Sequence, residues 1–406
     1  MAQQHLEPTE STTATGPPVP ATSDTDALAS YLRAQATEFL RALRLHRETG
    51  GGGSASANGA HGPDAASPPE RPVDAARALR RAARRLSGTL HTYQPLLDAD
   101  WAEAMRPELA WLSGTLALEH AYASRLERLL QALHRLSGSS AFPDRRPTGR
   151  TAATVTGTTT GPATGTPAVT VPAAHRPPPD RAHLTVGAAK AGALLDRQLT
   201  LARTRAHSTA LQALGSSRFH AVADKVALLA SDVPLRPTAG ITAGPAQGLT
   251  APGSTPTTGL RLLAAAAEDR LTDAVAALPL VTAGSPYNAQ ALVHGLSPDP
   301  APHPQDTQWH QVRLLLRLHR YALEVLAGGD GAVAEDVRLL AAAEALDRHR
   351  DASEAAAAAA QAARTPRIAP ATAYALGVLH ADQRHEVEAA RYAFQHSWRK
   401  EPIRLP

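Results

Sequence analysis

The sequence predicts an all-α fold built from helical bundles. Large apolar residues recur at spacings of three and four along nearly every segment that could fold, as they do on the buried face of a helix. Alternating runs of Val, Ile and Thr between tight turns, which would predict strands, are missing. A basic pattern near residue 80 returns near residue 313, and such a repeat indicates an internally duplicated architecture.

Six segments carry the helical spacing, and residues at their ends support the assignment. Asp98 and Asp100 are candidate N-terminal caps, and a glycine pair that begins at Gly328 follows the last of the six segments. Pro95 and Pro107 are expected at or near helix ends. Helices of about 15 to 20 residues normally pack as bundles. The predicted helices span residues 26–46, 78–97, 98–136, 189–214, 259–278 and 310–327.

Other stretches have few large apolar residues and no helical period, so burial cannot offset the entropy of ordering them. We expect a disordered tail at 1–25 and flexible linkers or insertions at about 50–70, 142–180, 236–258 and 281–307. The linker 236–258 then separates an N-terminal half, 26–235, from a C-terminal half, 259–406.

Composition excludes several classes of protein. The 406 residues include no cysteine, so no disulfide framework or thiolate chemistry exists. We find neither a secretory leader nor an apolar run long enough to span a membrane, and we expect a cytoplasmic protein. The net charge of +4 is concentrated locally: six arginines stand between Arg71 and His91 against Asp74 alone, which indicates an anionic partner.

The strongest basic pattern lies in HQVRLLLRLHRYALE, residues 310–324. His310, Arg313, Arg317 and Arg320 fall within roughly 80° of a helix circumference that is otherwise mostly apolar. We therefore expect a helix buried on most sides whose cations face a narrow groove or channel. Neighbouring like charges repel, and Glu324 in the same stripe is too little to neutralise them, so an external anion is favoured. The alternative is a solvated face paired with acids on neighbouring helices.

An earlier segment repeats the spacing of this stripe. Arg77, Arg80, Arg84 and Ser87 follow the same intervals of three, four and three, and His91 continues the stripe by one turn. Two further arginines, Arg81 and Arg85, add charge at its margin.

These two segments resemble the repeated motif of the CHAD domain, the conserved histidine α-helical domain. The motif reads approximately H-x-x-R-x-x-x-[KR]-x-x-R, followed in its second copy by R-Y-A-L-E, and HQVRLLLRLHRYALE matches this copy through Tyr321. LDRHRDA, residues 346–352, resembles the next element and keeps Arg350 and Asp351, with Asp347 in place of glycine. The phrases YQPLL and ELAWL resemble the flanks of the first copy.

The first copy is degenerate. Arg77 stands where the family has histidine, Ser87 stands opposite the last arginine of the second copy, and Ala121 replaces the aspartate of the following element. The resemblance implies two four-helix bundles related by a pseudo-twofold axis, around a basic central channel that binds inorganic polyphosphate, with a link to polyphosphate granules. The contacts expected from it are Arg77, Arg80, Arg84, Arg85, His310, Arg313, Arg317 and Arg320.

The residue chemistry agrees with this ligand, because arginine forks bind phosphate oxygens in pairs and stay charged at cellular pH. We expect no catalysis, no cofactor and no metal site, since the histidines lack ligand spacing and no phosphate-binding glycine loop follows a strand. Nucleic acid is the rival ligand, disfavoured by an aromatic content of 4%. A scaffold whose basic residues pair with internal acids is the other alternative. For His310, the alternative to a phosphate donor is a core histidine that is hydrogen-bonded across the bundle.

Overall fold

The structure, a computed structural model, describes residues 24–51, 70–138, 179–236, 258–285, 289–296, 303–328 and 336–399. Within these ranges every regular element is a helix, and the only β-type contact is an isolated bridge between Leu97 and Leu235. The all-α prediction is confirmed. The predicted tail and most of the predicted linker residues lie outside the described ranges.

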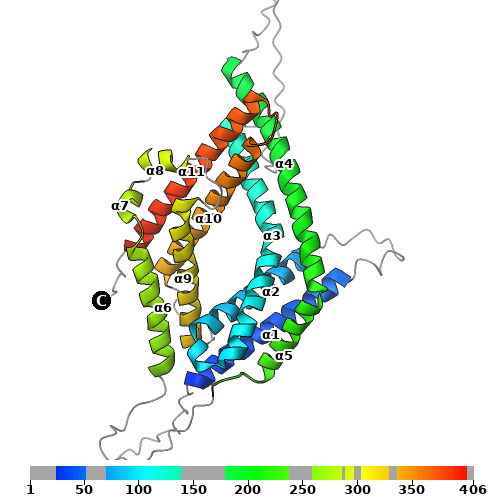
Figure 1. Cartoon of the computed structure of the whole chain (residues 1–406), viewed down its shortest axis with the longest axis vertical. Helices are drawn as coiled ribbons and strands as arrows, with labels where there is room; N and C mark the ends of the chain where they lie inside the picture. The colour runs from blue at the N-terminus through cyan, green and yellow to red at the C-terminus, as the bar shows by residue number, and fades with distance from the viewer. Residues whose placement is uncertain are drawn as a thin grey trace, which may run out of the picture. The chain divides into compact units, whose positions relative to one another are not determined.

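The described helices follow one another along the chain without a strand between them (Figure 1). The six predicted segments correspond to α1, α2, α3, α4, α6 and α9. The elements are α1 Asp24–Gly51, α2 Glu70–Thr92, the 3₁₀ turn η1 Gln94–Leu96, α3 Ala99–Ser137, α4 Pro179–Leu214, α5 Ser217–Ser231, α6 Thr258–Ala276, α7 Leu280–Ala283, α8 Ala289–Gly295, α9 Pro304–Leu326, α10 Val337–Ala363 and α11 Pro370–Arg399.

Two helix ends match the predicted signals, whereas Asp100, also a candidate cap, lies in the first turn of α3. Asp98 accepts a hydrogen bond from the backbone N–H of Trp101 at 2.8 Å and so caps α3, and Gly328 after α9 adopts a φ of 74°. Pro107, expected near a helix end, lies inside α3 instead. The helix continues past it because Met105 and Leu109, on either side of the proline, are both fully buried.

The segment 281–307, expected to be a flexible insertion, contains helical structure. It holds most of α7, all of α8 and the first turn of α9, while residues 286–288 and 297–302 lie outside the described ranges. Tertiary packing stabilises helices this short: Leu280 packs against an apolar cluster, and Gly295 lies against the guanidinium of Arg384.

The chain forms two compact units, each assembled from three stretches of sequence. Unit 1 comprises Met1–Ser113, Ser217–Arg270 and Arg317–Ala334, and unit 2 comprises Gly114–Ser216, Leu271–Leu316 and Glu335–Pro406. The unit boundaries fall within α3, α6 and α9, so these helices contribute to both units. Each unit therefore draws on both of the halves defined by the linker 236–258.

Unit 1 packs α1 against α2 and α5, together with the first part of α3 and the second part of α9. Its core consists of side chains at spacings of three and four on each helix, as the sequence predicts. The largest fully buried members include Leu32 and Phe39 of α1, Leu79, Leu86 and Leu90 of α2, Met105 of α3 and Phe219 of α5.

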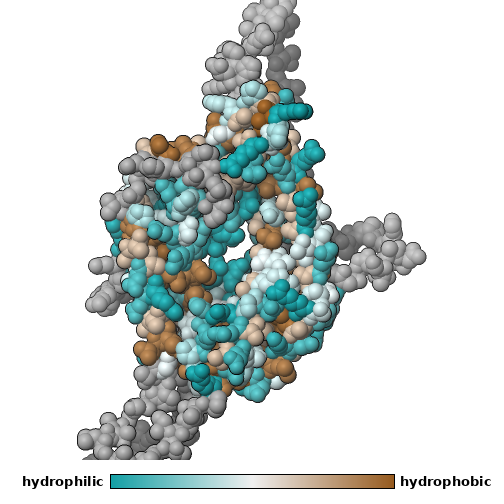
Figure 2. Space-filling model, in the orientation of Figure 1, coloured by the Kyte–Doolittle hydropathy of each residue, from teal (hydrophilic) through white to brown (hydrophobic). Residues whose placement is uncertain are grey.

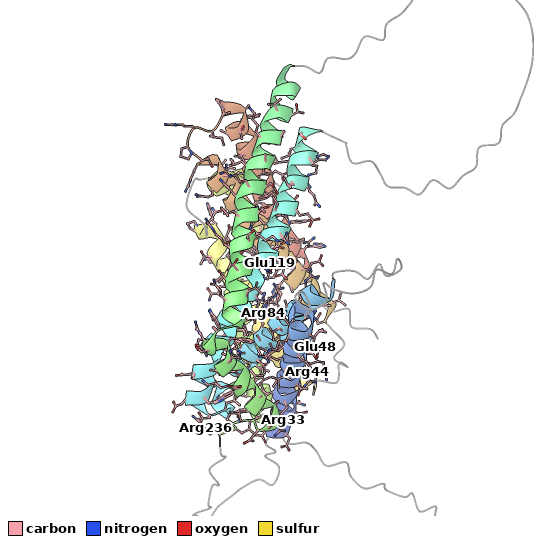
Figure 3. The ribbon with its side chains drawn as sticks, turned by 90° about the vertical axis from the view of Figure 1, so that its right-hand side faces the viewer. Arg33, Arg44, Glu48, Arg84, Glu119 and Arg236 are labelled. Atoms are coloured by element: carbon pink, nitrogen blue, oxygen red, sulfur yellow. The ribbon has the colours of Figure 1, made fainter. Side chains whose placement is uncertain are left out.

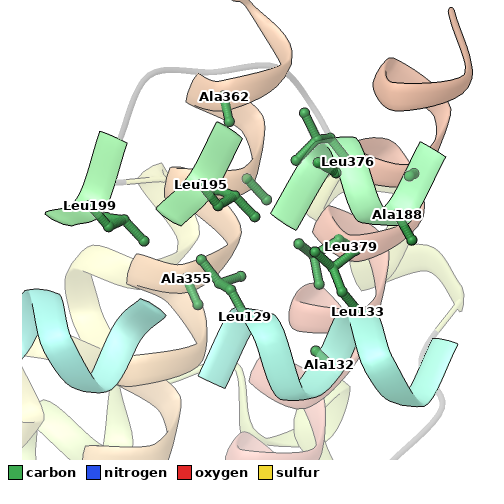
Figure 4. Close-up of a cluster of buried hydrophobic side chains, with 13 residues drawn as sticks. Leu129, Ala132, Leu133, Ala188, Leu195, Leu199, Ala355, Ala362, Leu376 and Leu379 are labelled. Atoms are coloured by element: carbon green, nitrogen blue, oxygen red, sulfur yellow. The ribbon is translucent and has the colours of Figure 1, made fainter. Parts of the chain in front are cut away.

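Unit 2 contains two apolar clusters on the same pair of helices, α10 and α11. In the first cluster, the C-terminal part of α10 and the N-terminal part of α11 pack against α3 and α4 (Figure 4). This cluster includes Leu129, Leu195, Ala359 and Leu376. The other joins the opposite ends of α10 and α11 with α6, α7 and α9, around Trp309. The alanine run of α10 lets neighbouring helices approach closely.

None of the described helices is long and apolar enough to cross a membrane. Figure 2 shows hydrophobic side chains scattered among hydrophilic ones on the visible face. Exposed large apolar residues, such as Leu228 and Leu262 in unit 1 and Tyr374 in unit 2, belong to different helices.

Candidate anion-binding surfaces

A glycine allows α2 to approach the second half of α9 in unit 1. A Cβ atom placed on Gly88 would lie 2.6 Å from Cδ2 of Tyr321, closer than real Cβ atoms approach, and 3.2 Å from Leu318, which is a tight contact. The hydroxyl of Tyr93 donates to the carbonyl of Ala322 at 3.0 Å and holds the same contact. α2 and the second half of α9 therefore approach closely in unit 1 at Gly88.

The charges of three predicted contact residues act on Tyr321. Burial raises the pKa of Tyr321, and the positive charges of Arg317, Arg84 and Arg85 oppose that increase. Charges from α2 and α9 consequently act on the same tyrosine, although more than 230 positions separate Arg85 from Arg317 in sequence. Arg84, Arg85 and Arg317 are half-buried, which lowers the dielectric screening of their charges.

One of these arginines already has a carboxylate partner. Nε of Arg85 donates to Oε2 of Glu324 at 2.8 Å, and the hydroxyl of Tyr31 donates to the same oxygen at 2.8 Å. Burial is the largest single influence and opposes the charged form of Arg85, but the hydrogen bond and charge of Glu324, together with Tyr31 and Tyr321, outweigh it and raise the pKa of the guanidinium. Burial, followed by the charge of Glu324, raises the pKa of Tyr31 well above its usual range.

The remaining predicted residues of unit 1 follow two helix faces. Arg80 and Arg320 are half-buried on α2 and α9, and Arg77, at the place of the missing histidine, is exposed. Ser87 donates to the backbone carbonyl of Arg106 at 3.2 Å, so this departure from the motif serves the contact with α3.

His91 contacts α3 in a similar way. Nη1 of Arg106 lies 3.0 Å from Nδ1 of His91, and burial, followed by the charges of Arg106 and Arg270, lowers the pKa of His91. A neutral His91 accepts this hydrogen bond through Nδ1, so that nitrogen is not available to an anion.

His310 and Arg313 lie in unit 2, on the first half of the same helix that carries Arg317 and Arg320. Nε of Arg313 donates to Oδ1 of Asp347 at 2.5 Å. The ring of His310 is half-buried and lies edge-on to that of His349, with centroids 5.6 Å apart. Burial lowers the pKa of His310; the charge of Asp306 opposes this shift and that of Arg313 adds to it.

Other cations of unit 2 are also compensated by acids. Glu354 of α10 forms ion pairs with Arg350, at 2.8 Å, and with Arg125 of α3. Arg135 of α3 likewise pairs with Asp382 of α11 at 3.2 Å. These three arginines of unit 2 are thus held by acids of neighbouring helix turns or helices.

Sequence reasoning missed a buried ionic cluster between the two apolar clusters of unit 2. Asp306 at the start of α9 is fully buried and accepts hydrogen bonds from Arg384 and Arg391 of α11, each at 2.7 Å. Ser353 of α10 donates to Asp306 at 2.5 Å, and Glu388 accepts from Arg391 at 2.8 Å. The signal in the sequence was the placement of these α11 charges on the same face as its buried leucines.

Two other features do not match the predicted contacts. A groove of about 610 Å³ between α3 and α4 is lined mainly by apolar atoms of residues such as Leu130 and Ala188, and includes none of the predicted basic residues. Among the described residues, no three His, Asp or Glu side chains are grouped as metal ligands would be.

The helical fold and paired basic repeats are those of a CHAD domain. A match to the CHAD domain family spans residues 60–360, and the chain belongs to this family. Among solved structures, PptA from Streptomyces chartreusis is similar, with 60% sequence identity and a TM-score of 0.65. The match covers 93% of this chain and 99% of the PptA chain. No curated protein matches the chain.

Proposed function

We propose that this protein binds inorganic polyphosphate without hydrolysing it, through the basic faces of α2 and α9. The observation that carries the proposal is the close contact of α2 with α9 at Gly88 in unit 1, where charges of arginines from both repeats act on Tyr321. Membership of the CHAD family supports the same ligand class. An association with polyphosphate granules would follow from that binding.

The geometry of these helices suits a repeating phosphate chain. Arg77, Arg80 and Arg84 on α2, and Arg317 and Arg320 on α9, recur at helical spacings of three and four. At about 1.5 Å per residue, the stripe from Arg77 to Arg84 follows about 10 Å of a polyanion. A guanidinium presents planar donor pairs that match phosphate oxygens, and it keeps its charge throughout the physiological pH range.

Two tryptophans are poorly placed for base stacking, which favours polyphosphate over single-stranded nucleic acid, although the half-buried Tyr321 lies at the contact of α2 with α9. Trp309 at the start of α9 is 1% exposed. In unit 1 the guanidinium of Arg218 covers the ring of Trp111 at 4.1 Å.

The test is a titration of labelled long-chain polyphosphate into the full chain, with single-stranded DNA of equal charge as competitor. Arg84→Ala/Arg317→Ala should weaken binding by at least about 100-fold, because each of the two charged contacts contributes about 1.5–3 kcal/mol and about 1.4 kcal/mol is tenfold. Arg33→Ala/Arg44→Ala is the matched control: it removes the same charge from exposed positions along α1 (Figure 3) and should change the affinity less than threefold. Equal losses in both variants would contradict a site at α2 and α9.

A phosphate-release assay on the same samples tests the absence of turnover. We expect no free phosphate above the blank during incubation with polyphosphate. Release that depends on the protein and disappears in Arg84→Ala/Arg317→Ala would show that the site is catalytic.

The ion pairs Arg85–Glu324 and Arg313–Asp347 favour a second candidate, a scaffold in which basic residues serve folding. The two candidates differ in what the arginine variants change. A scaffold predicts that Arg84→Ala/Arg317→Ala lowers the melting temperature and that the wild-type protein fails to bind polyphosphate. The proposed function predicts lost binding with little change in melting temperature.

A further inference from the structure

In the ion pair between Arg313 and Asp347, the cation is largely buried and the anion is exposed to solvent. The side chain of Arg313 is 18% exposed, whereas that of Asp347 is 55% exposed. A ligand that approaches from solvent therefore meets the carboxylate of Asp347 before it reaches the guanidinium. Both residues belong to unit 2, on the adjacent helices α9 and α10.

We propose that Asp347 is a resident carboxylate that competes with phosphate for Arg313 and thereby sets the affinity of unit 2 for polyphosphate. This inference rests on the proposed function and adds a residue that regulates it. A carboxylate and a phosphate present similarly spaced oxygens to a guanidinium, so one can replace the other on the same donors.

The hydrogen bond of the pair places this competition on a specific atom. Nε of Arg313 points to Oδ1 of Asp347, and Nε is one of the donors with which arginine forms a two-pronged contact. A phosphate oxygen can take this donor only after the carboxylate leaves. Binding at Arg313 is consequently weakened by the free energy of the ion pair that must be broken.

Two neighbouring groups add little positive charge at that position. Arg350, one turn along α10 from Asp347, is held by Glu354 at 2.8 Å. Burial lowers the pKa of His310, so its ring is neutral at pH 7.5. The carboxylate that the structure shows bound to Arg313 is that of Asp347.

Asp347 is dispensable for the fold. Its carboxylate is largely solvated, and exposed ion pairs contribute little to stability. The register of α10 is fixed by buried neighbours on its other face, including Ala345, Leu346 and His349. A substitution at Asp347 therefore changes charge without disturbing the core.

The test compares Asp347→Asn with Glu344→Gln in the full chain. Glu344 lies three residues earlier on α10, is exposed, and forms no ion pair with any residue that the structure describes, so its replacement removes the same charge from nearly the same place. Asp347→Asn should tighten polyphosphate binding about two- to tenfold, whereas Glu344→Gln should change it less than twofold. By analogy with DNA, the slope of the logarithm of the binding constant against the logarithm of salt should steepen by the contribution of about one further cation in Asp347→Asn, and should not change in Glu344→Gln.

A double-mutant cycle with Arg313→Ala identifies the route of the effect. If Asp347 acts through Arg313, Asp347→Asn adds nothing once Arg313 is absent. A gain that persists without Arg313, or one that Glu344→Gln reproduces, would be a general charge effect and would overturn the inference while leaving the proposed function intact. Failure of both wild type and Asp347→Asn to bind polyphosphate would instead refute the proposed function.

Discussion

Asp306 is the residue whose loss should destabilise this protein most. Its carboxylate is fully buried and accepts from Arg384, Arg391 and Ser353. Burial alone would raise the pKa of Asp306, but hydrogen bonds from His349 and Arg384 outweigh it and hold the pKa far below its usual range. Asp306→Asn keeps the side-chain shape, removes the charge and turns an amide N–H₂ toward two guanidinium groups.

The expected cost is about 3–5 kcal/mol, because the substitution leaves two buried arginines with Glu388 as their remaining buried acid among the described residues. That is a large part of the roughly 5–15 kcal/mol by which a typical domain is stable.

The assay is urea denaturation followed by circular dichroism at pH 7.5. The control is Glu38→Gln, which breaks the exposed pair with Arg41 and should cost less than about 1 kcal/mol. A loss below about 1 kcal/mol for Asp306→Asn would refute the reasoning, since it would mean that the arginines find solvent or other partners without Asp306. Replacing Asp306, Arg384 and Arg391 together by apolar residues of similar size should restore much of the stability.

Three further outcomes are expected. Burial lowers the pKa of His349 to about 4, from the ordinary histidine value of 6.5, so the unfolded chain binds more protons than the folded chain between these pH values. The free energy of unfolding should therefore fall by about 3 kcal/mol as the pH drops from 6.5 to 4. Denaturation series at several pH values should show that His349→Gln flattens this dependence. Burial also lowers the pKa of His310, so polyphosphate binding should take up a proton that calorimetry in two buffers detects, and His310→Gln should abolish this uptake. Gly88→Val should lower the melting temperature, because its side chain would collide with Tyr321; an unchanged melting curve would contradict the close contact.

The sequence predicted helices best where one face is apolar and the other polar. α2 and α9 are such helices, and their basic stripes are evident from residue spacing alone. α10 was not singled out, because its alanine run offers no contrast between faces although Ala355, Ala359 and Ala362 form part of a core. α11 was obscured because charged residues, among them Arg384, occupy positions on its buried face.

Ion pairs between distant positions could not be predicted, because they depend on which helices become neighbours. Arg85 and Glu324 are 239 positions apart, and Arg384 and Asp306 are 78 apart. The spacing that placed Glu324 within the stripe of α9 was correct, but it gave no indication that Glu324 would bind an arginine of α2. The same limit applies to Asp347, which the sequence marked only as a departure from the family motif.

These pairs limit how many cations a polyanion can neutralise, and that number is measurable. Of the eight predicted contacts, Arg85 and Arg313 are held by acids, and His310 is neutral at pH 8 because burial lowers its pKa. At most five arginines then contribute to the release of counterions. With about 0.7 ions per contact, as for single-stranded nucleic acid, the logarithm of the binding constant should fall with the logarithm of salt with a slope no steeper than about −3.5. A slope near −5.6 at pH 8 would mean that all eight residues are available, and that the ion pairs of the free protein give way to polyphosphate without cost.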